Sequence, residues 1–134
     1  MNLTRKDDWP ALLAAEIEAA RGRLFSWGTH DCCAFCARCV AAITGRDFMV
    51  EFGAYADEFD AAAMIEQCGG VARIARACLG PQIDVTLAQR GDVVMRATSE
   101  GNALGICLGE QSAFASSRGL AFHPTAGCNG AWRV

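Results

Sequence analysis

The sequence predicts a single α+β domain, helical over residues 8–80 and β-rich over residues 90–134. Apolar residues recur at helical spacing in the first part. From about residue 90 the apolar runs are short and are separated by Gly, Asn and Ser, which is typical of strands. With 134 residues, 52% hydrophobic and 20% charged, the chain can form one core but not two. We therefore expect residues 1–134 to form one domain, with helices preceding a small antiparallel sheet that is curled or barrel-like.

The first predicted helix begins at D-D-W-P, residues 7–10, and ends near Gly22. Pro10 lies near the first helical position, where the missing N–H removes no helical hydrogen bond. The apolar side chains recur at helical spacing, at Leu12, Leu13, Ile17, Ala20 and Leu24. We expect this amphipathic helix to cover the core.

The second predicted helix is the segment around which we expect the rest of the chain to be organised. From Cys32 to Ile43 the residues are apolar or small, and Arg38 carries the one charge. Asp31 is the predicted N-cap, and Thr44-Gly45 is the predicted end. A helix that is apolar nearly all the way round belongs inside a domain.

The remaining elements follow in order along the chain. An irregular piece is expected over residues 46–53, and a third helix over residues 55–67, where Tyr55, Phe59 and Ala63 recur at steps of four. A fourth helix over residues 71–79 ends at Gly80-Pro81. Strands are predicted over residues 92–97, 103–108, 113–116, 120–123 and 131–134. We interpret R-G-D at residues 90–92 as a turn entering the first strand, although it matches an adhesion tripeptide.

Charge and hydropathy argue against two classes of partner. The formal net charge is −3 and no Lys/Arg cluster is present, which argues against nucleic acid. No stretch approaches the roughly 20 apolar residues of a membrane span, and no apolar run follows the opening M-N-L-T-R-K-D-D. We expect synthesis in the bacterial cytoplasm without a signal peptide. No phosphate-binding Gly-rich loop follows a strand, and no cofactor is predicted.

The chain has eight cysteines, which is many for its length, at positions 32, 33, 36, 39, 68, 78, 107 and 128. In a cytosolic product we expect reduced thiols. Cys32, Cys36 and Cys39 have the C-x-x-x-C-x-x-C spacing of the iron–sulfur site of radical enzymes, but a helix does not wrap a cluster. A zinc site that uses part of this cysteine cluster is an alternative, although no second C-x-x-C completes it.

Cys32 is the candidate nucleophile. It lies in the first turn of its predicted helix, where unpaired backbone N–H groups and the helix dipole favour a thiolate. The preceding turn places Gly28, His30 and Asp31 against the helix start, which is useful at a site and unnecessary for packing. The competing interpretation of Cys32 is a small buried hydrophobic residue.

Several motifs resemble, in the same order, those of the NlpC-type, papain-like cell-wall cysteine peptidases. They are W-G-x-x-D-C at residues 27–32, G-D-V-V at residues 91–94 and x-L-G-I-C-L-G at residues 103–109. The resemblance extends from Phe25 to about Leu120. It is closest to a small phage- and prophage-associated branch, which shares F-x-W-G-x-x-D-C, T-G-x-D (residues 44–47), a G-G pair and a terminal A-W-R-V.

The resemblance implies a papain-like fold, in which Cys32 is the nucleophile on a helix packed against a β-barrel. It also implies cleavage of peptide bonds in peptidoglycan and a place at the tip of a phage tail. The expected partners are other tail-tip or hub proteins and the peptidoglycan peptide.

One departure from the family pattern concerns the catalytic base. In active members the strand after G-D-V-V begins H-V-G-I-Y-L-G, and its His is the base for the cysteine. Ala103 occupies that position here, and Ala cannot accept a proton. Residues 114–116 occupy the region of the polar residue that orients the His, and Ser116 is the polar one among them.

Two histidines remain as candidate bases. His30 precedes Cys32 by two residues, and His123 lies at the end of a predicted strand that a barrel can bring near the helix start. Asp31 is either the N-cap alone or also a residue that orients a histidine. The candidate catalytic residues are therefore Cys32, His123, His30 and Asp31.

Three functions follow as hypotheses. The first is a tail-tip protein with a papain-like fold that has lost turnover and acts as a structural or binding component. The second is an active peptidoglycan cysteine endopeptidase that uses Cys32 with His123 or His30. The third is a metal-binding module built on the cysteine cluster.

Overall fold

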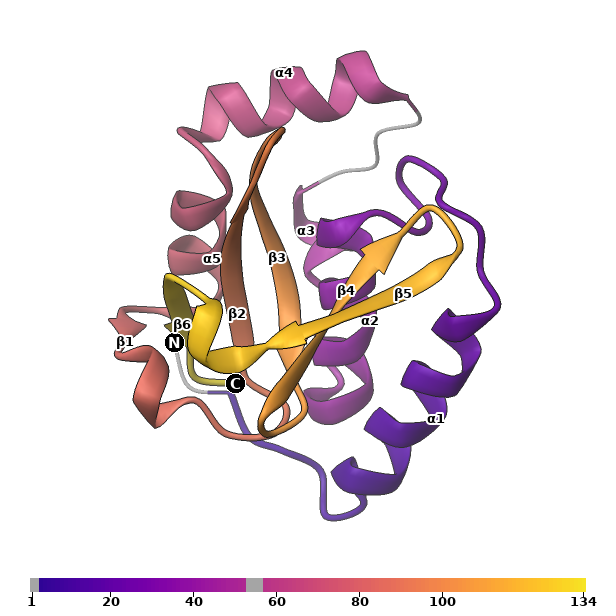
Figure 1. Ribbon diagram of the computed structural model, residues 1–134, viewed down its shortest axis with the longest axis vertical. Helices are drawn as coiled ribbons and strands as arrows, with labels where there is room; N and C mark the ends of the chain where they lie inside the picture. The colour runs from indigo at the N-terminus through magenta and orange to yellow at the C-terminus, as the bar shows by residue number, and fades with distance from the viewer. Residues whose placement is uncertain (1–2, 53–56) are drawn as a thin grey trace.

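The computed structural model describes residues 3–52 and 57–134, which form five α-helices followed by one six-stranded sheet (Figure 1). The helices are α1 (Trp9–Arg21), α2 (Cys32–Thr44), α3 (Phe48–Phe52), α4 (Glu58–Cys68) and α5 (Val71–Leu79). The strands are β1 (Gln82–Ile83), β2 (Val93–Thr98), β3 (Gly101–Cys107), β4 (Gln111–Ser116), β5 (Gly119–Pro124) and β6 (Gly130–Trp132). Two short 3-10 helices, η1 (Val85–Leu87) and η2 (Thr125–Gly127), complete the described elements. The prediction of an α+β chain with helices first is confirmed.

The sheet is antiparallel, with the strand order β1-β6-β2-β3-β4-β5. All five predicted strands are present, each within two residues of its predicted ends. The sequence analysis missed β1, because a strand of two residues is too short to show an alternating pattern. In the described part of the chain, no helix has the length and apolar character that crossing a membrane requires.

The central helix α2 has the predicted boundaries. Asp31 is its N-cap, and one carboxylate oxygen accepts a hydrogen bond of 2.8 Å from the Ala34 amide. Gly45 ends the helix in the left-handed conformation, at φ 84°, which a residue with a side chain rarely adopts. Seven α2 residues are buried, namely Ala34, Phe35, Cys36, Ala37, Cys39, Val40 and Ile43.

Two predictions about residues 46–67 are wrong. The predicted irregular piece over residues 46–53 contains α3, and α4 begins at Glu58, where the side chain of Asp57 caps it. Tyr55, with which the third helix was predicted to begin, lies outside the described residues. Phe59 is 88% exposed, although it was assigned to the apolar face of this helix. The residues of α4 that are buried or pack against the core are instead Ala61, Met64, Ile65 and Cys68.

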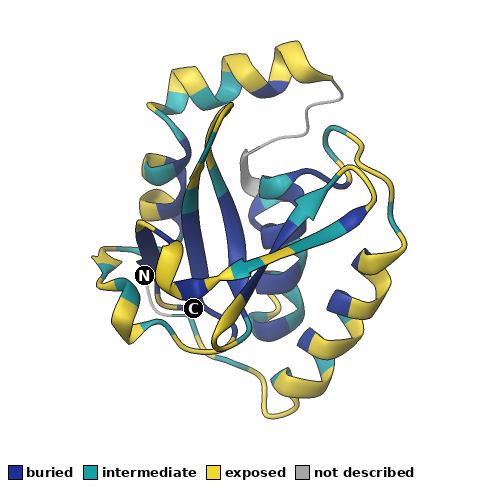
Figure 2. Ribbon diagram, in the orientation of Figure 1, coloured by how far each residue is buried: buried dark blue, intermediate teal, exposed yellow. Residues whose placement is uncertain are grey.

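The two faces of the sheet bury different side chains, because successive residues of a strand point to opposite sides. On one face, Leu104, Ile106 and Ala113 pack in the main core with residues of α1, α2 and α5. On the other face, Cys107 and Phe114 form a smaller cluster with the C-terminal part of the chain and the segment around η1. Figure 2 shows the buried residues concentrated in α2 and the centre of the sheet, and exposed residues along the outer side of α1 and α4.

Strands β3 and β4 pair over a short length and then separate. Their register contains two residue pairs, Ile106 with Ala113 and Cys107 with Ser112. Figure 1 shows the strands diverging from that point, with α2 behind the gap, and α2 contacts both strands. Helix α2 therefore packs against β3 and β4 where these two strands are not paired with each other.

The R-G-D segment is a turn that enters β2, as predicted, and its aspartate is fully buried. One carboxylate oxygen of Asp92 accepts hydrogen bonds of 3.0 Å from the Arg5 guanidinium and the Val134 amide. The other accepts a bond of 2.9 Å from the Gln89 amide. Asp92 thus joins the segment before α1, the turn before β2 and the segment after β6 in one buried polar cluster.

Candidate functional site

Cys32 is the first residue of α2, and it is half-buried beside a second thiol. Its sulfur lies 3.9 Å from the sulfur of Cys33, which is also half-buried. The Leu104 amide, in the part of β3 that has no partner on β4, hydrogen-bonds to the Cys32 sulfur. The thiol therefore lies where the start of α2 meets the separated strands.

The pKa of the Cys32 thiol is lowered, chiefly because the Cys33 thiol donates a hydrogen bond to its sulfur. The backbone amides of Leu104 and Cys33 act in the same direction, whereas burial and the Asp31 carboxylate oppose them. The amide donors are those expected at a helix start and at an unpaired strand edge. The net result favours a thiolate at Cys32.

The other thiols of α2 have the opposite tendency. The pKa of Cys33 is raised, because its proton is held in the hydrogen bond to Cys32 and because partial burial disfavours the charged form. Burial likewise raises the pKa of Cys36 and Cys39, since a thiolate there would lose its hydration. Cys32 is therefore the one of the four that ionises first.

Asp31 fixes the turn that precedes Cys32. Besides capping α2, its second carboxylate oxygen accepts a hydrogen bond of 2.7 Å from the amide of Gly28, which has φ 81°. Both oxygens therefore bond to backbone amides on either side of the helix start. The prediction that Asp31 is the N-cap is confirmed.

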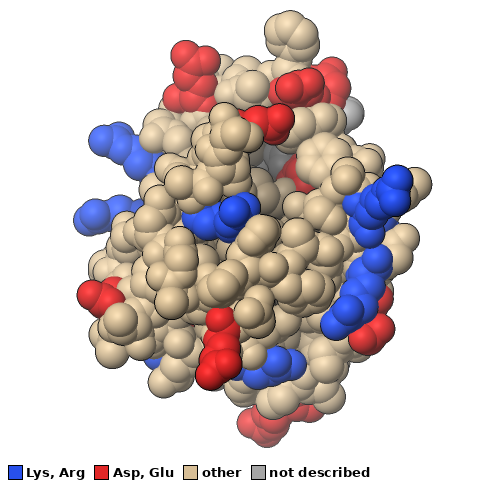
Figure 3. Space-filling model, in the orientation of Figure 1, with Lys and Arg blue, Asp and Glu red and all other residues tan. Residues whose placement is uncertain are grey.

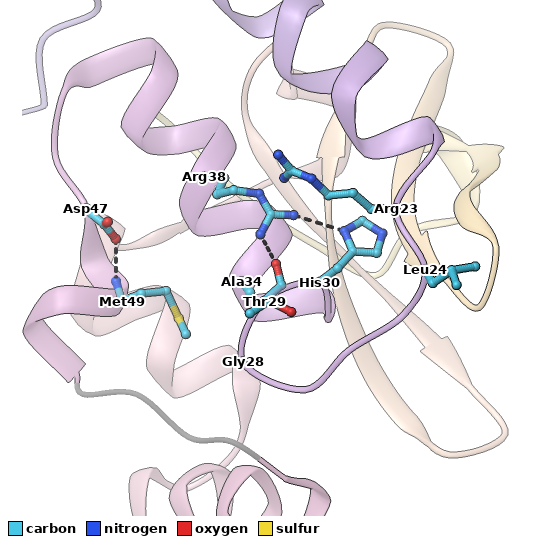
Figure 4. A pocket seen from close by; sticks show the side chains of 9 residues that line it. All are labelled: Arg23, Leu24, Gly28, Thr29, His30, Ala34, Arg38, Asp47 and Met49. Carbon is cyan, nitrogen blue, oxygen red and sulfur yellow. Dashed lines mark hydrogen bonds between the residues drawn. The ribbon is translucent and has the colours of Figure 1, made fainter.

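His30 is 1% exposed, and both of its ring nitrogens have partners, of which Figure 4 shows Arg38. Nε2 lies 2.7 Å from the carbonyl oxygen of Gly119, which can only accept, so Nε2 carries the proton. Nδ1 then accepts a hydrogen bond of 3.0 Å from the Arg38 guanidinium. Arg38 also donates to the Thr29 carbonyl and to Glu16. The ring thus connects the loop before α2 to β5 and is not hydrogen-bonded to Cys32.

His123 lies on the face of the sheet that is turned away from α2. It is paired with Ser112 across β4 and β5, and directly opposed residues share a face. Phe114, two residues along β4, is on that same face, and its ring centroid is 5.7 Å from that of His123. Ala113, which lies between Ser112 and Phe114 in the sequence, points to the opposite face and packs with the helices. The structure therefore does not bring His123 to Cys32.

Ala103 aligns with the base His of the NlpC-type peptidases that the sequence resembles. It is close to the Cys32 thiol in the chain path, because it directly precedes Leu104, whose amide bonds to the sulfur. The position expected for an orienting polar residue is filled by packing. Phe114 is 3% exposed, and its ring covers Gly105 so closely that a Cβ on that glycine would lie 2.5 Å from it. Ser116 is paired with Gly119 beside the turn between β4 and β5.

Two hollows flank the loop before α2. One, of about 570 Å³, is shown in Figure 4 and is lined by Arg23, Leu24, Gly28, Thr29, His30, Ala34, Arg38, Asp47 and Met49. The other, of about 860 Å³, lies between Trp27, α4, the start of α5 and the turn from β2 to β3. Figure 3 shows the surface hollowed below α4, with mostly uncharged side chains over the sheet.

A metal centre finds no support in the part of the chain that is described. Within residues 3–52 and 57–134, no three His, Cys, Asp or Glu side chains converge as metal ligands require. No disulfide bond joins any of the eight cysteines, all of which lie in the described residues.

Comparison with protein families matches residues 4–134 to a family described as a domain of unknown function, DUF6950. The chain belongs to the DUF6950 family. A search of curated proteins finds no match. The family description assigns no activity, so the chemistry of this DUF6950 domain has to be argued from its site.

Sequence reasoning missed three parts of the DUF6950 site. Cys33 was considered only as a zinc ligand, and its sulfur contact with Cys32 had no sequence signal, because adjacent residues of a helix point about 100° apart. Arg38 was noted as the one charge of an apolar helix, and that signal could have indicated a buried polar partner such as His30. The hydrogen bond from the Leu104 amide to Cys32 had no signal in the sequence, because whether this edge of β3 is paired depends on the three-dimensional path of β4.

Proposed function

We propose that this chain is a papain-like domain of the NlpC type that has lost its catalytic base and serves as a structural or binding component of a phage or prophage tail tip. The observation that carries the proposal is that neither histidine is hydrogen-bonded to Cys32. His30 is held by Gly119 and Arg38, and His123 lies on the far face of the sheet. Ala103 occupies the position that aligns with the base His of NlpC-type peptidases.

The arrangement around Cys32 agrees with the family likeness. The cysteine begins a buried helix, and this helix packs against an antiparallel sheet. Strand β3, which follows β2 and the G-D-V-V motif, passes beside the thiol. In papain-like enzymes that strand supplies the base, so its position is retained here while its side chain is not.

Without a base the thiolate is a poor peptidase. Attack on an amide gives a tetrahedral intermediate, and the amine leaves only if a group protonates it, which is the second task of the histidine in such enzymes. None of the hydrogen bonds and ion pairs described around Cys32 provides an acid in that position. Retention of the fold without turnover is the consistent interpretation.

An exposed apolar surface supports a role in assembly. Leu24 is 73% exposed and Phe25 is 38% exposed, on the loop after α1. Phe122 is 37% exposed on the edge strand β5, beneath the guanidinium of Arg21 at the end of α1. Because the Phe25 amide bonds to the Ser117 carbonyl, this loop and the β4–β5 turn lie together. We assign this surface to contact with another tail-tip or hub protein.

Digestion of purified peptidoglycan tests the loss of turnover. We expect the full chain to release no more soluble muropeptide than its Cys32→Ala variant does. Release by the unmodified chain that disappears in the Cys32→Ala variant would establish an active peptidase and overturn the proposal. Mass spectrometry of purified virions tests the second half, and absence of the chain from the tail would rule out a tail-tip role.

Restoring the base tests the papain-like assignment. In the Ala103→His variant, we expect alkylation of Cys32 by iodoacetamide to acquire a second pH inflection from the new imidazole, near its usual value of about 6.5. Ala121→His, at another half-buried strand position, is the matched control and should show no such inflection. An identical profile in both variants would show that position 103 does not face the thiol.

A further inference from the structure

The two thiols at the start of α2 suggest a chemistry that does not depend on a histidine. The sulfurs of Cys32 and Cys33 are 3.9 Å apart and both residues are half-buried, whereas Cys36 and Cys39 are 5% and 0% exposed. The donors to the Cys32 sulfur are a thiol and backbone amides. None of these donors has to accept a proton for the sulfur to react.

We propose that Cys32 and Cys33 form a dithiol modification site, at which Cys32 reacts with small disulfides and retains one half of the disulfide as a stable mixed disulfide. Cys33 is a positioning residue, because it acts through its hydrogen bond to the Cys32 sulfur. This inference goes beyond the proposed function, since it requires neither a papain-like origin nor a tail.

The reaction is balanced without any other group. The Cys32 thiolate attacks one sulfur of a disulfide R–S–S–R, a new S–S bond forms to Cys32, the original S–S bond breaks, and R–S⁻ leaves with the electron pair. A thiolate is a stable leaving group at neutral pH, since the usual thiol pKa is about 8.5. An amine leaving an amide needs a proton, which explains why this site accepts disulfides rather than peptides.

Helix geometry then keeps the mixed disulfide from being resolved internally. Cys33 is adjacent to Cys32, and neighbouring Cα atoms across a trans peptide are about 3.8 Å apart, below the usual disulfide range of about 4.4–6.8 Å. Cys36 lies one turn further on, where Cβ atoms are about 5–6 Å apart, beyond the usual disulfide separation of about 3.5–4.5 Å. Closing either bond requires the first turn of α2 to unwind.

The test uses the full reduced chain and oxidised glutathione at pH 7, with each cysteine followed by peptide mass mapping. We expect Cys32 to be modified at least about fivefold faster than Cys68, a half-buried thiol at the opposite, C-terminal end of a helix. The reaction of Cys32 should persist at pH 6.5, because the lowered pKa of its thiol keeps more of the reactive thiolate at that pH. Equal rates at both positions would overturn the proposal.

Two variants test the part played by Cys33. Cys33→Ala removes the donor and should slow modification of Cys32 severalfold, whereas Cys33→Ser keeps a donor and should restore most of the rate. Equal rates in Cys33→Ala and the unmodified chain would refute a dithiol site. After excess oxidised glutathione is removed, we expect the glutathione to stay on Cys32. Its loss with formation of a Cys32–Cys33 or Cys32–Cys36 disulfide would show that the helix does not protect the adduct.

Discussion

Asp31 and Asp92 are both buried, at 2% and 0% exposure, but they connect very different parts of the chain. Asp31 accepts hydrogen bonds from the amides of Gly28 and Ala34, each three residues away. Asp92 accepts bonds from Val134 and Arg5, which are 42 and 87 residues away. One aspartate shapes a single turn beside the thiols, and the other joins three distant segments.

The difference separates the stability of the domain from the chemistry of its site. A change at Asp92 removes hydrogen bonds that join both ends of the described chain to the turn before β2. A change at Asp31 alters the turn and the charge next to Cys32, while the sheet and its termini keep their contacts. Substitutions in the two clusters should therefore affect different measurements.

Removal of Asp92 is expected to have the largest effect. Asp92→Ala removes the charged acceptor of the partly buried Arg5 guanidinium, which keeps only its bonds to two backbone carbonyls, and leaves the Val134 amide without its acceptor. The free energy of unfolding should therefore fall by about 3–5 kcal/mol. Urea unfolding measures the loss. Asp84→Ala, at an exposed aspartate with local bonds to Thr86, is the control and should destabilise much less. Similar losses in both variants would show that the buried cluster contributes little.

Alkaline pH should lower the free energy of unfolding through the buried thiols of α2, the helix that Asp31 caps. The pKa values of the buried Cys36 and Cys39 thiols are raised by burial, so these groups stay protonated in the folded state while they ionise in the unfolded state. Their stabilisation is complete below the unfolded pKa of about 8.5 and is lost above it. We expect the free energy of unfolding to fall by about 2 kcal/mol between pH 8.5 and pH 9.5.

Urea unfolding under reducing conditions at the two pH values measures this loss. A double variant, Cys36→Ala with Cys39→Ala, should reduce the difference, since it lacks both thiols. An undiminished difference in the variant would assign the alkaline effect to other groups.

Changes at Asp31 should have a smaller effect on stability and a distinct effect on reactivity. Asp31→Ala removes the N-cap of α2 and should cost about 1–2 kcal/mol, whereas Asp31→Asn keeps an acceptor and should cost less. The Asp31 carboxylate raises the pKa of Cys32, so Asp31→Asn should lower it further and speed alkylation at pH 6. If Asp31→Asn slows alkylation instead, the carboxylate supports the thiolate by a contact that outweighs its charge.

A change at His123 is expected to have the smallest effect. His123→Ala removes a half-buried ring on the face opposite α2, so stability should change by no more than about 0.5 kcal/mol. The rate and pH profile of Cys32 alkylation should not change. A slower reaction with a lost inflection near pH 6.5 would place the imidazole at the thiol and favour the active peptidase.

The same contrast explains what could be predicted from the sequence. The Asp31 cap, the ends of α2 and the turn at Gly91 depend on residues within a few positions, and all three predictions are confirmed. The packing of α4 was predicted wrongly, because Phe59 looked like a core residue until the position of the helix exposed it.

Long-range contacts at the site were not predictable from periodicity. The partners of His30 come from Arg38, eight residues on, and from Gly119, 89 residues on, so the sequence could not show that both nitrogens are occupied. The face on which His123 lies depends on strand register, and a shift of one residue would have reversed it. The contact between the Cys32 and Cys33 sulfurs depended on side-chain orientation, since adjacent helical residues do not face each other, and the position of the Leu104 amide depended on where β4 leaves β3.

The separation of β3 from β4 gives the site a spectroscopic reporter. The amide of Leu104 is turned to a sulfur atom rather than to a neighbouring strand, so its proton frequency in an NMR spectrum should follow the ionisation of Cys32 directly. The amide of Cys107, which bonds to the Asp92 carbonyl, should hardly move over the same titration. Hydrogen–deuterium exchange at Leu104 should likewise accelerate when the sulfur is alkylated, so one backbone position reports the state of the thiol without any label.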